Sequence, residues 1–201
     1  MNRYVPIVVI GLLLVFSILA GDSPADPSPS PLGAKTTIRE PMKNALARVN
    51  KKPFGLYVSP DNSPVNPEHF TGYHTGVDFE TTAGEQNQDV DVYVICSGPL
   101  ISKTTATGYG GIAVQSCKID GQSVTVVYGH IRLSSVSAKT GDQLAAGDHL
   151  AVLGTTYSAE TGDERKHLHL GIHKGNSVNI LGYAQRESDL SQWLNVAAYL
   201  P

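Results

Sequence analysis

Short apolar runs separated by turn residues fill the chain from about residue 79 onward, and they limit the fold more than any other feature. The runs are Val90–Ile95, Ile112–Ile119, Val124–Tyr128, His149–Leu153 and His167–His173, and the turn signals between them include Asp120-Gly121, Gly141-Asp142 and Gly162-Asp163. Runs of this length with period-two alternation are typical of strands. Frequent Gly turns favour antiparallel connections. We therefore predict a mainly β, compact antiparallel sheet within one domain over residues 54–201.

Helical spacing occurs in two short places. Between Ser188 and Leu200, apolar residues recur at intervals of three and four, which predicts a short C-terminal helix packed on the sheet, with Trp193 in the core. The same spacing between Met42 and Val49 predicts a short helix, which the prolines from Pro53 onward end. Neither segment is expected to carry chemistry.

The N-terminus predicts export. After Arg3, residues 5–20 are apolar and uncharged, as in a signal peptide or a retained membrane anchor, and the sequence leaves both alternatives open. Either one places the remainder outside the cytoplasm, secreted or anchored to the membrane, because the positive charge precedes the apolar run. Four prolines within residues 21–33 indicate a solvated spacer. The predicted organisation is residues 1–20 signal or anchor, 21–53 spacer and short helix, and 54–201 the folded domain.

Charge excludes one class of partner. The chain has 201 residues and a formal net charge of -3, so it lacks the basic excess with which proteins bind a phosphate backbone. We expect no nucleic-acid partner, and membrane contact only through the N-terminal segment. The oligomeric state is open.

The two cysteines are expected to form a disulfide. If the hairpin loop is centred between Ala106 and Thr107, paired residue numbers sum to 213, and Cys96 faces Cys117 at a distance that a disulfide accepts. An exported protein retains such a bond. The alternative is a pair of buried thiols, because Pro99 can shift the register.

The chemistry is expected to come from histidine, of which the chain has seven. His167 and His169 are two apart on a strand, so both side chains project from one face with Cα atoms about 6.6 Å apart. His173 shares that face but lies about 13 Å beyond His169. Since zinc ligands lie about 2.0 to 2.2 Å from the ion, His173 is excluded from the same site unless the strand bends at Gly171. Strand parity treats His167 and His169 as equals.

Two further segments supply candidate groups. His74 and Asp78 flank Gly76, whose freedom in φ is expected to allow a turn that brings imidazole and carboxylate together. His130 ends an apolar strand. Each motif alone is more typical of structural residues. Together they supply two imidazoles and one carboxylate for a tetrahedral zinc ion with an open fourth position, and two spare histidines.

The order HxxxD, YGH and HLH over residues 70–173 resembles the lysostaphin and LytM type of zinc metalloendopeptidase, which cleaves peptidoglycan. The resemblance implies a compact antiparallel β-sheet domain with a groove lined by long loops. It also implies that His74, Asp78 and His169 bind Zn²⁺. His130 and His167 are then the catalytic pair, and the resemblance does not distinguish which of the two is the general base.

The implied function is a zinc-dependent endopeptidase that hydrolyses peptide bonds of peptidoglycan stem peptides or cross-bridges. The alternative is a catalytically inactive member that binds the cell wall or activates another hydrolase. The sequence departs from the family at Arg165 and Lys166, where a small residue or Pro is usual before HLH. The loop Tyr157–Lys166 is expected to line the groove and to alter specificity.

Overall fold

Twelve strands and five short 3-10 helices make up the described part of the protein, which in this computed structural model is residue 1 and residues 37–201. The predicted signal or anchor and the spacer lie outside the described residues. The strands are β1 Tyr57–Val58, β2 Gly72–His74, β3 Gly76–Glu80, β4 Asp91–Tyr93, β5 Gly98–Ala106, β6 Gly110–Ile119, β7 Gln122–Gly129, β8 Gln143–Leu144, β9 His149–Val152, β10 His167–Lys174, β11 Tyr183–Ala184 and β12 Trp193–Leu194. The helices are η1 Leu46–Arg48, η2 Ala83–Glu85, η3 Leu133–Ser135, η4 Glu187–Gln192 and η5 Val196–Ala198.

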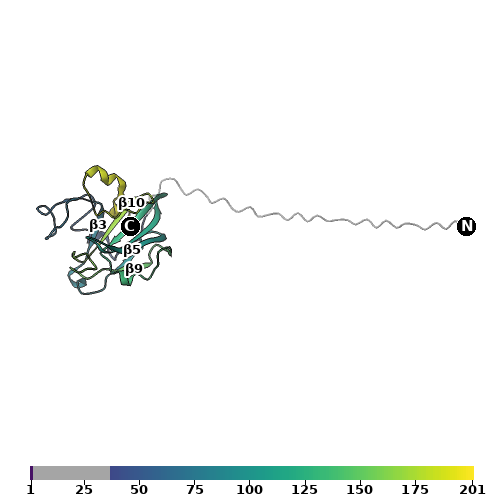
Figure 1. Ribbon diagram of the computed structural model, residues 1–201, viewed down its shortest axis with the longest axis horizontal. Helices are drawn as coiled ribbons and strands as arrows, with labels where there is room; N and C mark the ends of the chain where they lie inside the picture. The colour runs from purple at the N-terminus through teal and green to yellow at the C-terminus, as the bar shows by residue number, and fades with distance from the viewer. Residues whose placement is uncertain (2–36) are drawn as a thin grey trace. The chain divides into compact units, whose positions relative to one another are not determined.

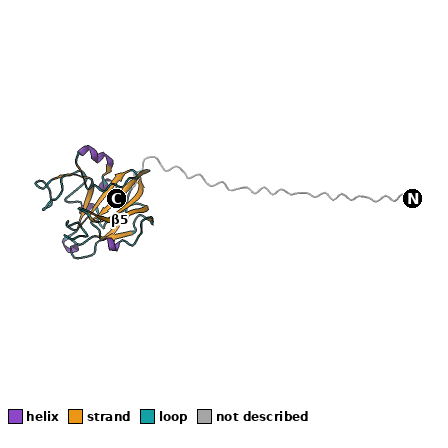
Figure 2. Ribbon diagram, viewed as in Figure 1, coloured by secondary structure: helices purple, strands orange, loops and turns teal. Residues whose placement is uncertain are grey.

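The main sheet is antiparallel, as the strand and turn pattern predicts, and contains seven strands (Figures 1 and 2). Its order is β12-β10-β7-β6-β5-β8, and β3 also pairs with β10. Strand β10 therefore has β7 along one edge, and first β3 and then β12 along the other. Smaller sheets pair β4 with β9, and β1 with β2 and β11. This arrangement places β10 between β3, which carries Asp78, and β7, which His130 follows.

Alternation along β10 separates the core from the histidines. Leu168, Leu170 and Ile172 are fully buried in the main hydrophobic core. Because successive side chains of a strand point to opposite faces, His167 and His169 lie on the other face. That face is also covered, since both imidazoles are buried. One face of β10 therefore packs into the hydrophobic core, and the opposite face carries the histidine side chains.

Two hydrophobic clusters stabilise the sheet. The larger includes Met42 and Ala45, so residues that precede position 54 also pack into the core. The smaller contains Tyr109, Ile112, Val114 and Val127. The domain boundary predicted after residue 53 remains a prediction. Residues before that boundary also contribute to the core of the domain.

The helical segments are shorter than the spacing predicts. Only Leu46–Arg48 is helical in the first segment, because Asn44 has a left-handed φ of 58° that breaks the turn, and Leu46 is 47% exposed. The C-terminal segment forms η4 and η5 rather than one continuous helix, because Trp193 and Leu194 pair as β12 with β10. Trp193 is buried, as expected.

The Cys96–Cys117 disulfide is present, with Cα atoms 6.1 Å apart. The register used to predict it is wrong, because near the turn Ala106 pairs with Gly110, and a bulge between Leu100 and Ser102 then shifts the register. The loop is centred on Gly108, with its left-handed φ of 79°, rather than between residues 106 and 107. The register depends on both the turn at Gly108 and the bulge, and the number sum captures neither.

No helix within residues 37–201 is long and apolar enough to cross a membrane. The predicted signal peptide or anchor falls in residues 1–20, of which the structure describes only the first, so the prediction of a secreted or membrane-anchored protein rests on the sequence.

Candidate metal centre

Cross-strand pairing brings His169 and Asp78 together. Asp78 of β3 is the direct partner of His169 in β10, and Gly129 of β7 is the partner on the other side. Directly paired residues of adjacent antiparallel strands lie close enough for side-chain contact. His74 ends β2, and only Thr75 separates it from the start of β3, so its ring enters the same space from the β2–β3 corner.

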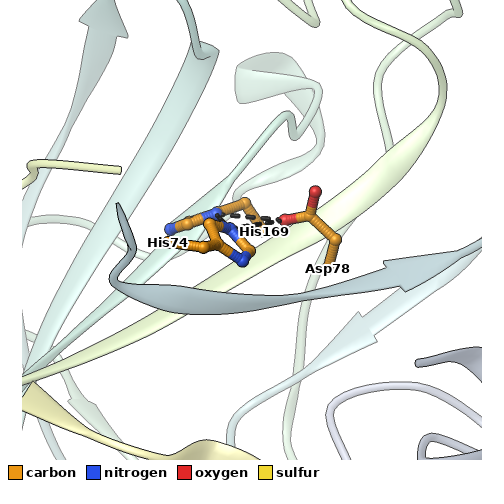
Figure 3. Close-up of side chains that lie close together, drawn as sticks. All are labelled: His74, Asp78 and His169. Carbon is orange, nitrogen blue, oxygen red and sulfur yellow. Dashed lines mark hydrogen bonds and ion pairs between the residues drawn. The ribbon is translucent and has the colours of Figure 1, made fainter. Parts of the chain in front are cut away.

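Three ligand atoms converge at this point (Figure 3). Nε2 of His74 lies 3.0 Å from Nδ1 of His169 and 3.2 Å from Oδ1 of Asp78. Nδ1 of His169 lies 3.1 Å from the same carboxylate oxygen. All three residues are buried, and they form the one group of three or more potential metal ligands among the residues that the structure describes.

The hydrogen bonds of the ring nitrogens suit a cation. Nδ1 of His74 lies 3.1 Å from the Pro53 carbonyl, so it carries the proton, and Nε2 presents a lone pair to Asp78 and His169. Three electron-rich atoms therefore meet, and a proton on His169 Nδ1 is the only donor available within the triangle. Such a donor set, two imidazoles and one carboxylate, is a zinc ligand set that leaves a fourth position open. The residues present therefore fit a divalent cation.

His130 and His167 lie beside this group without joining it. Their ring centroids are 4.2 Å apart. Nδ1 of His130 donates to the Thr161 carbonyl at 2.9 Å, which leaves its Nε2 as an acceptor. Nδ1 of His167 lies 2.8 Å from the Arg165 carbonyl, and its Nε2 lies 3.3 Å from Oδ2 of Asp78. The orientation of His130 depends on an unusual left-handed φ of 62° at the end of β7.

Charge and burial determine the protonation of the group. Burial opposes the charge of Asp78, but the attraction of His167 and His74 outweighs it and holds the pKa of Asp78 well below its usual value. Burial lowers the pKa of His169 to about 4, and burial together with the neighbouring His167 holds the pKa of His130 well below 6.5. At neutral pH the site thus has the carboxylate of Asp78 beside the neutral ring of His169, the form in which these two side chains bind metal.

All five site residues proposed from the sequence are brought together, whereas His173 is not. His173 packs edge to face against Trp193 at 4.9 Å, away from the ligand group. The reason given for Gly76 is wrong. Gly76 is absent from the glycines with a left-handed φ, and an added Cβ would lie 2.6 Å from the Leu170 carbonyl oxygen and 2.7 Å from the His169 ring. Glycine is required for space rather than for a turn.

Sequence reasoning missed Tyr109. Its ring centroid lies 5.3 Å from the rings of both His130 and His169. Its hydroxyl is buried and has no hydrogen-bond partner among the described residues. Burial and the charge of Asp78 raise the pKa of this phenol, so it remains a donor. The only feature of the sequence that points to this position is the pair of flanking glycines, Gly108 and Gly110, and these predicted a turn rather than a functional residue.

Sequence reasoning also missed the role of Arg165, which it recorded only as a departure. The Arg165 Nη2 donates to Oδ2 of Asp78 at 2.7 Å and to Glu80 at 2.5 Å, and its Nε donates to Glu80 at 3.1 Å. Asp78 and Glu80 are two apart on β3, so both project from one face. Arg165 neutralises this pair and holds Asp78 with Oδ2 away from the ligand triangle, which leaves Oδ1 for a metal.

A cavity of about 340 Å³ opens over the site. Its lining includes Asp78, Tyr109, His130, His167 and His169 from the site, and Lys52, Glu164 and Tyr183 from its walls. Lys52 is buried and donates to the Tyr183 hydroxyl at 2.9 Å while it pairs with Glu68 at 2.5 Å. The ring of Tyr183 lies 5.3 Å from His74. A partly open, mainly apolar space above convergent polar groups is typical of a ligand site.

Comparison with known proteins gives one family and one similar fold. The model of Peptidase family M23 matches residues 72–180, a range that contains all five residues of the site. No curated protein matches the sequence.

Among solved structures, the catalytic domain of the antimicrobial peptidase lysostaphin from Staphylococcus simulans is similar, with a TM-score of 0.51 and 22% identity, over 78% of this chain and 96% of that one. LytU has a TM-score of 0.46 and 20% identity, over 75% and 92% of the two chains. Csd3 from Helicobacter pylori has a TM-score of 0.47 and 16% identity, over 83% of this chain and 34% of that one. At these identities the likeness to lysostaphin shows the fold.

Proposed function

The chain belongs to Peptidase family M23, the lysostaphin and LytM type, and we propose that it is a zinc-dependent endopeptidase that hydrolyses peptide bonds of peptidoglycan stem peptides or cross-bridges. The observation that carries the proposal is the buried convergence of one atom each from His74, Asp78 and His169 within 4.8 Å of one another. Two further imidazoles border the cavity above them. A family match alone would not supply that arrangement.

The three ligands would hold zinc through Nε2 of His74, Oδ1 of Asp78 and Nδ1 of His169. A bound zinc ion supplies a Lewis acid, which polarises a peptide carbonyl and acidifies a nearby water molecule. The protein contributes ligands that are already oriented. The Pro53 carbonyl fixes the ring of His74, and Arg165 fixes the carboxylate of Asp78.

His130 and His167 would move the protons. Their Nδ1 atoms are occupied by the carbonyls of Thr161 and Arg165, so Nε2 is the atom that each ring has for proton transfer, and in His167 it lies 3.3 Å from Oδ2 of Asp78. His130 is held neutral by burial, as a general base must be before it accepts a proton. The other ring then protonates the leaving amine or stabilises the developing oxyanion. Positioned proton transfer of this kind contributes about 10²- to 10⁴-fold.

Tyr109 would add a neutral donor. Its hydroxyl lies in the cavity wall without a partner among residues 37–201. Hydrogen-bond donors that are fixed before the reaction stabilise the charge that develops on a carbonyl oxygen. Tyr109 is suited to this role because its raised pKa keeps the proton on the phenol.

Peptidoglycan as substrate implies action outside the cytoplasm, in agreement with the predicted N-terminal signal or anchor. The domain would act on the cell wall as a secreted or membrane-tethered enzyme. Nucleic acid remains an unexpected partner because of the net charge of -3.

The test combines elemental analysis with digestion. We expect the purified protein to contain about one zinc ion per chain and to release peptide fragments, identified by mass, from whole peptidoglycan. His169→Ala should lose the metal, whereas His167→Ala should keep the metal and lose cleavage. His173→Gln is the matched control on the same strand, and it should keep both.

Retention of metal and activity in both alanine variants would contradict the assigned roles. Zinc binding without release of any wall fragment would instead support the alternative, an inactive cell-wall-binding or hydrolase-activating domain.

A further inference from the structure

A second cavity adjoins the first and shares two wall residues with it. It has a volume of about 300 Å³, and Glu164 and Arg165 line both cavities. A peptide chain that crosses the site can therefore extend past these residues. The second cavity is lined mainly by polar and charged side chains, including Lys51, Asp163 and Lys166.

Glu164 is a largely buried residue whose carboxylate is poorly paired and accessible from the cavities that it lines. Glu164 is 7% exposed. In the described part of the chain, its carboxylate accepts no hydrogen bond, and its one ion pair is with Nη1 of Arg165 at 4.0 Å. A largely buried charge is favoured when it is paired and hydrogen-bonded, so a cationic group that enters the cavity would be a favourable partner for this carboxylate.

The neighbouring cations are already engaged. Arg165 is held by Asp78 and Glu80. Lys51 lies 3.5 Å from Glu80, and Lys166 donates to the carbonyls of Gln86 and Gln88 instead of turning to Glu164. Glu164 is thus the wall group at the junction of the cavities whose charge is least compensated.

Tyr157 adds an aromatic side chain to the second cavity, which Glu164 also lines. Its backbone N–H donates to the Glu164 carbonyl at 2.8 Å, which closes the loop that carries both residues. The side chain of Tyr157 is 63% exposed and lines the second cavity. An aromatic face and a carboxylate together form a favourable environment for an alkylammonium group.

We propose that Glu164 and Tyr157 form a subsite for a primary ammonium group of the peptide substrate, which makes Glu164 a specificity-determining residue. The inference rests on the proposed peptidase function and adds the substrate class, a peptide with a free amine near the scissile bond. The amine can be an α-amino group or a side-chain amine. Either one supplies three N–H donors and a positive charge to the carboxylate of Glu164.

The first test uses the unmodified, zinc-loaded full chain. Amine-bearing peptide fragments of peptidoglycan are compared with the same fragments acetylated on all amines, on the α-amino group alone, or on the side-chain amine alone. A charge-assisted contact predicts that kcat/KM falls about tenfold or more when the recognised amine is acetylated. The two single acetylations identify which amine is bound.

The second test uses Glu164→Gln, with Glu187→Gln as control. Glu187 is exposed and lines neither cavity, so its variant removes one negative charge without changing the subsite. Glu164→Gln should lose about tenfold in kcat/KM on the amine-bearing peptide and should cleave the acetylated one as the parent does. Zinc content should be unchanged in both variants.

Equal kcat/KM of the parent for amine-bearing and acetylated peptides would overturn the subsite, as would a preference for the amine that persists in Glu164→Gln. Failure of the proposed function is distinguishable, because the parent would then cleave none of the peptides. Calorimetric titration of zinc-loaded His167→Ala with the amine-bearing and the acetylated peptide measures the same preference as a difference in binding affinity. Equal affinities for the two peptides would also overturn the subsite.

Discussion

Replacement of Gly76 by Ala tests whether a close approach of strands sets the metal centre. The new Cβ would lie 2.6 Å from the Leu170 carbonyl oxygen and 2.7 Å from Cε1 and Nε2 of His169. Carbon–oxygen contacts begin at about 3.3 Å, so the overlap to be relieved is roughly 0.7 Å. Either β3 must move away from β10, or the His169 ring must turn.

Both responses carry a cost that can be measured. Overpacking in a filled core destabilises by about 1–3 kcal/mol. Movement of the His169 ring also disturbs the 3.0 and 3.1 Å approaches of its Nδ1 to His74 and Asp78. Loss of ligand orientation of this kind lowers metal affinity by about 10- to 100-fold.

The assays are urea unfolding of the chelator-treated protein and zinc competition against a chromophoric chelator. Gly84→Ala is the matched control, because a Cβ at Gly84 meets nothing within 4 Å. We expect that control to change the free energy of unfolding by less than about 0.5 kcal/mol. If Gly76→Ala has the stability and zinc affinity of the parent, the packing argument for this glycine is refuted.

Three further outcomes are expected. Tyr109→Phe should lower kcat with little change in KM or zinc content, since it removes one hydroxyl that lines the cavity; an unchanged kcat in steady-state kinetics would remove Tyr109 from the mechanism. In metal-free protein, His130 has a pKa below its unfolded value, so its contribution to stability is present above pH 6.5 and is lost as pH falls. Below pH 6.5 the free energy of unfolding should therefore fall by up to about 1.4 kcal/mol per pH unit because of this group. The fall should be less steep in His130→Asn. If urea unfolding at several pH values gives the same dependence on pH for both proteins, the assignment is contradicted. The double variant Cys96→Ser, Cys117→Ser should lose about 3 kcal/mol, because the bond closes a loop of sequence separation 21; an unchanged thermal midpoint would show that the disulfide adds nothing.

Much of the fold was predictable because local pattern and turn chemistry agree. The strands β6, β7, β9 and β10 fall where apolar runs lie between turn residues. The hairpin register was not predictable, because a bulge near Leu100 depends on how β5 meets β6 over its whole length. The single C-terminal helix was predicted wrongly for a similar reason. Pairing of Trp193 with His173 imposes an extended backbone, which helical spacing in the sequence does not reveal.

The candidate site was predicted in its residue types but not in its supports. His74, Asp78, His130, His167 and His169 stand in motifs whose order resembles that of a known family. Tyr109 and Arg165 carry no such mark. Arg165 lies 87 residues from Asp78 in the chain, and its bond to that carboxylate forms only when the end of the preceding loop folds back over β3.

The order of donor residues and the alternation of strands are properties of the sequence itself. They determined an antiparallel β domain and a face that carries His167 and His169, because side-chain direction along a strand follows from backbone geometry alone. Tertiary structure decided which nitrogen of His169 faces Asp78 and which carboxylate oxygen of Asp78 accepts from Arg165. It also decided that the carboxylate of Glu164 has only one ion pair, at 4.0 Å from Arg165. These outcomes depend on distances between segments far apart in the chain, and such distances are set by packing rather than by local preference.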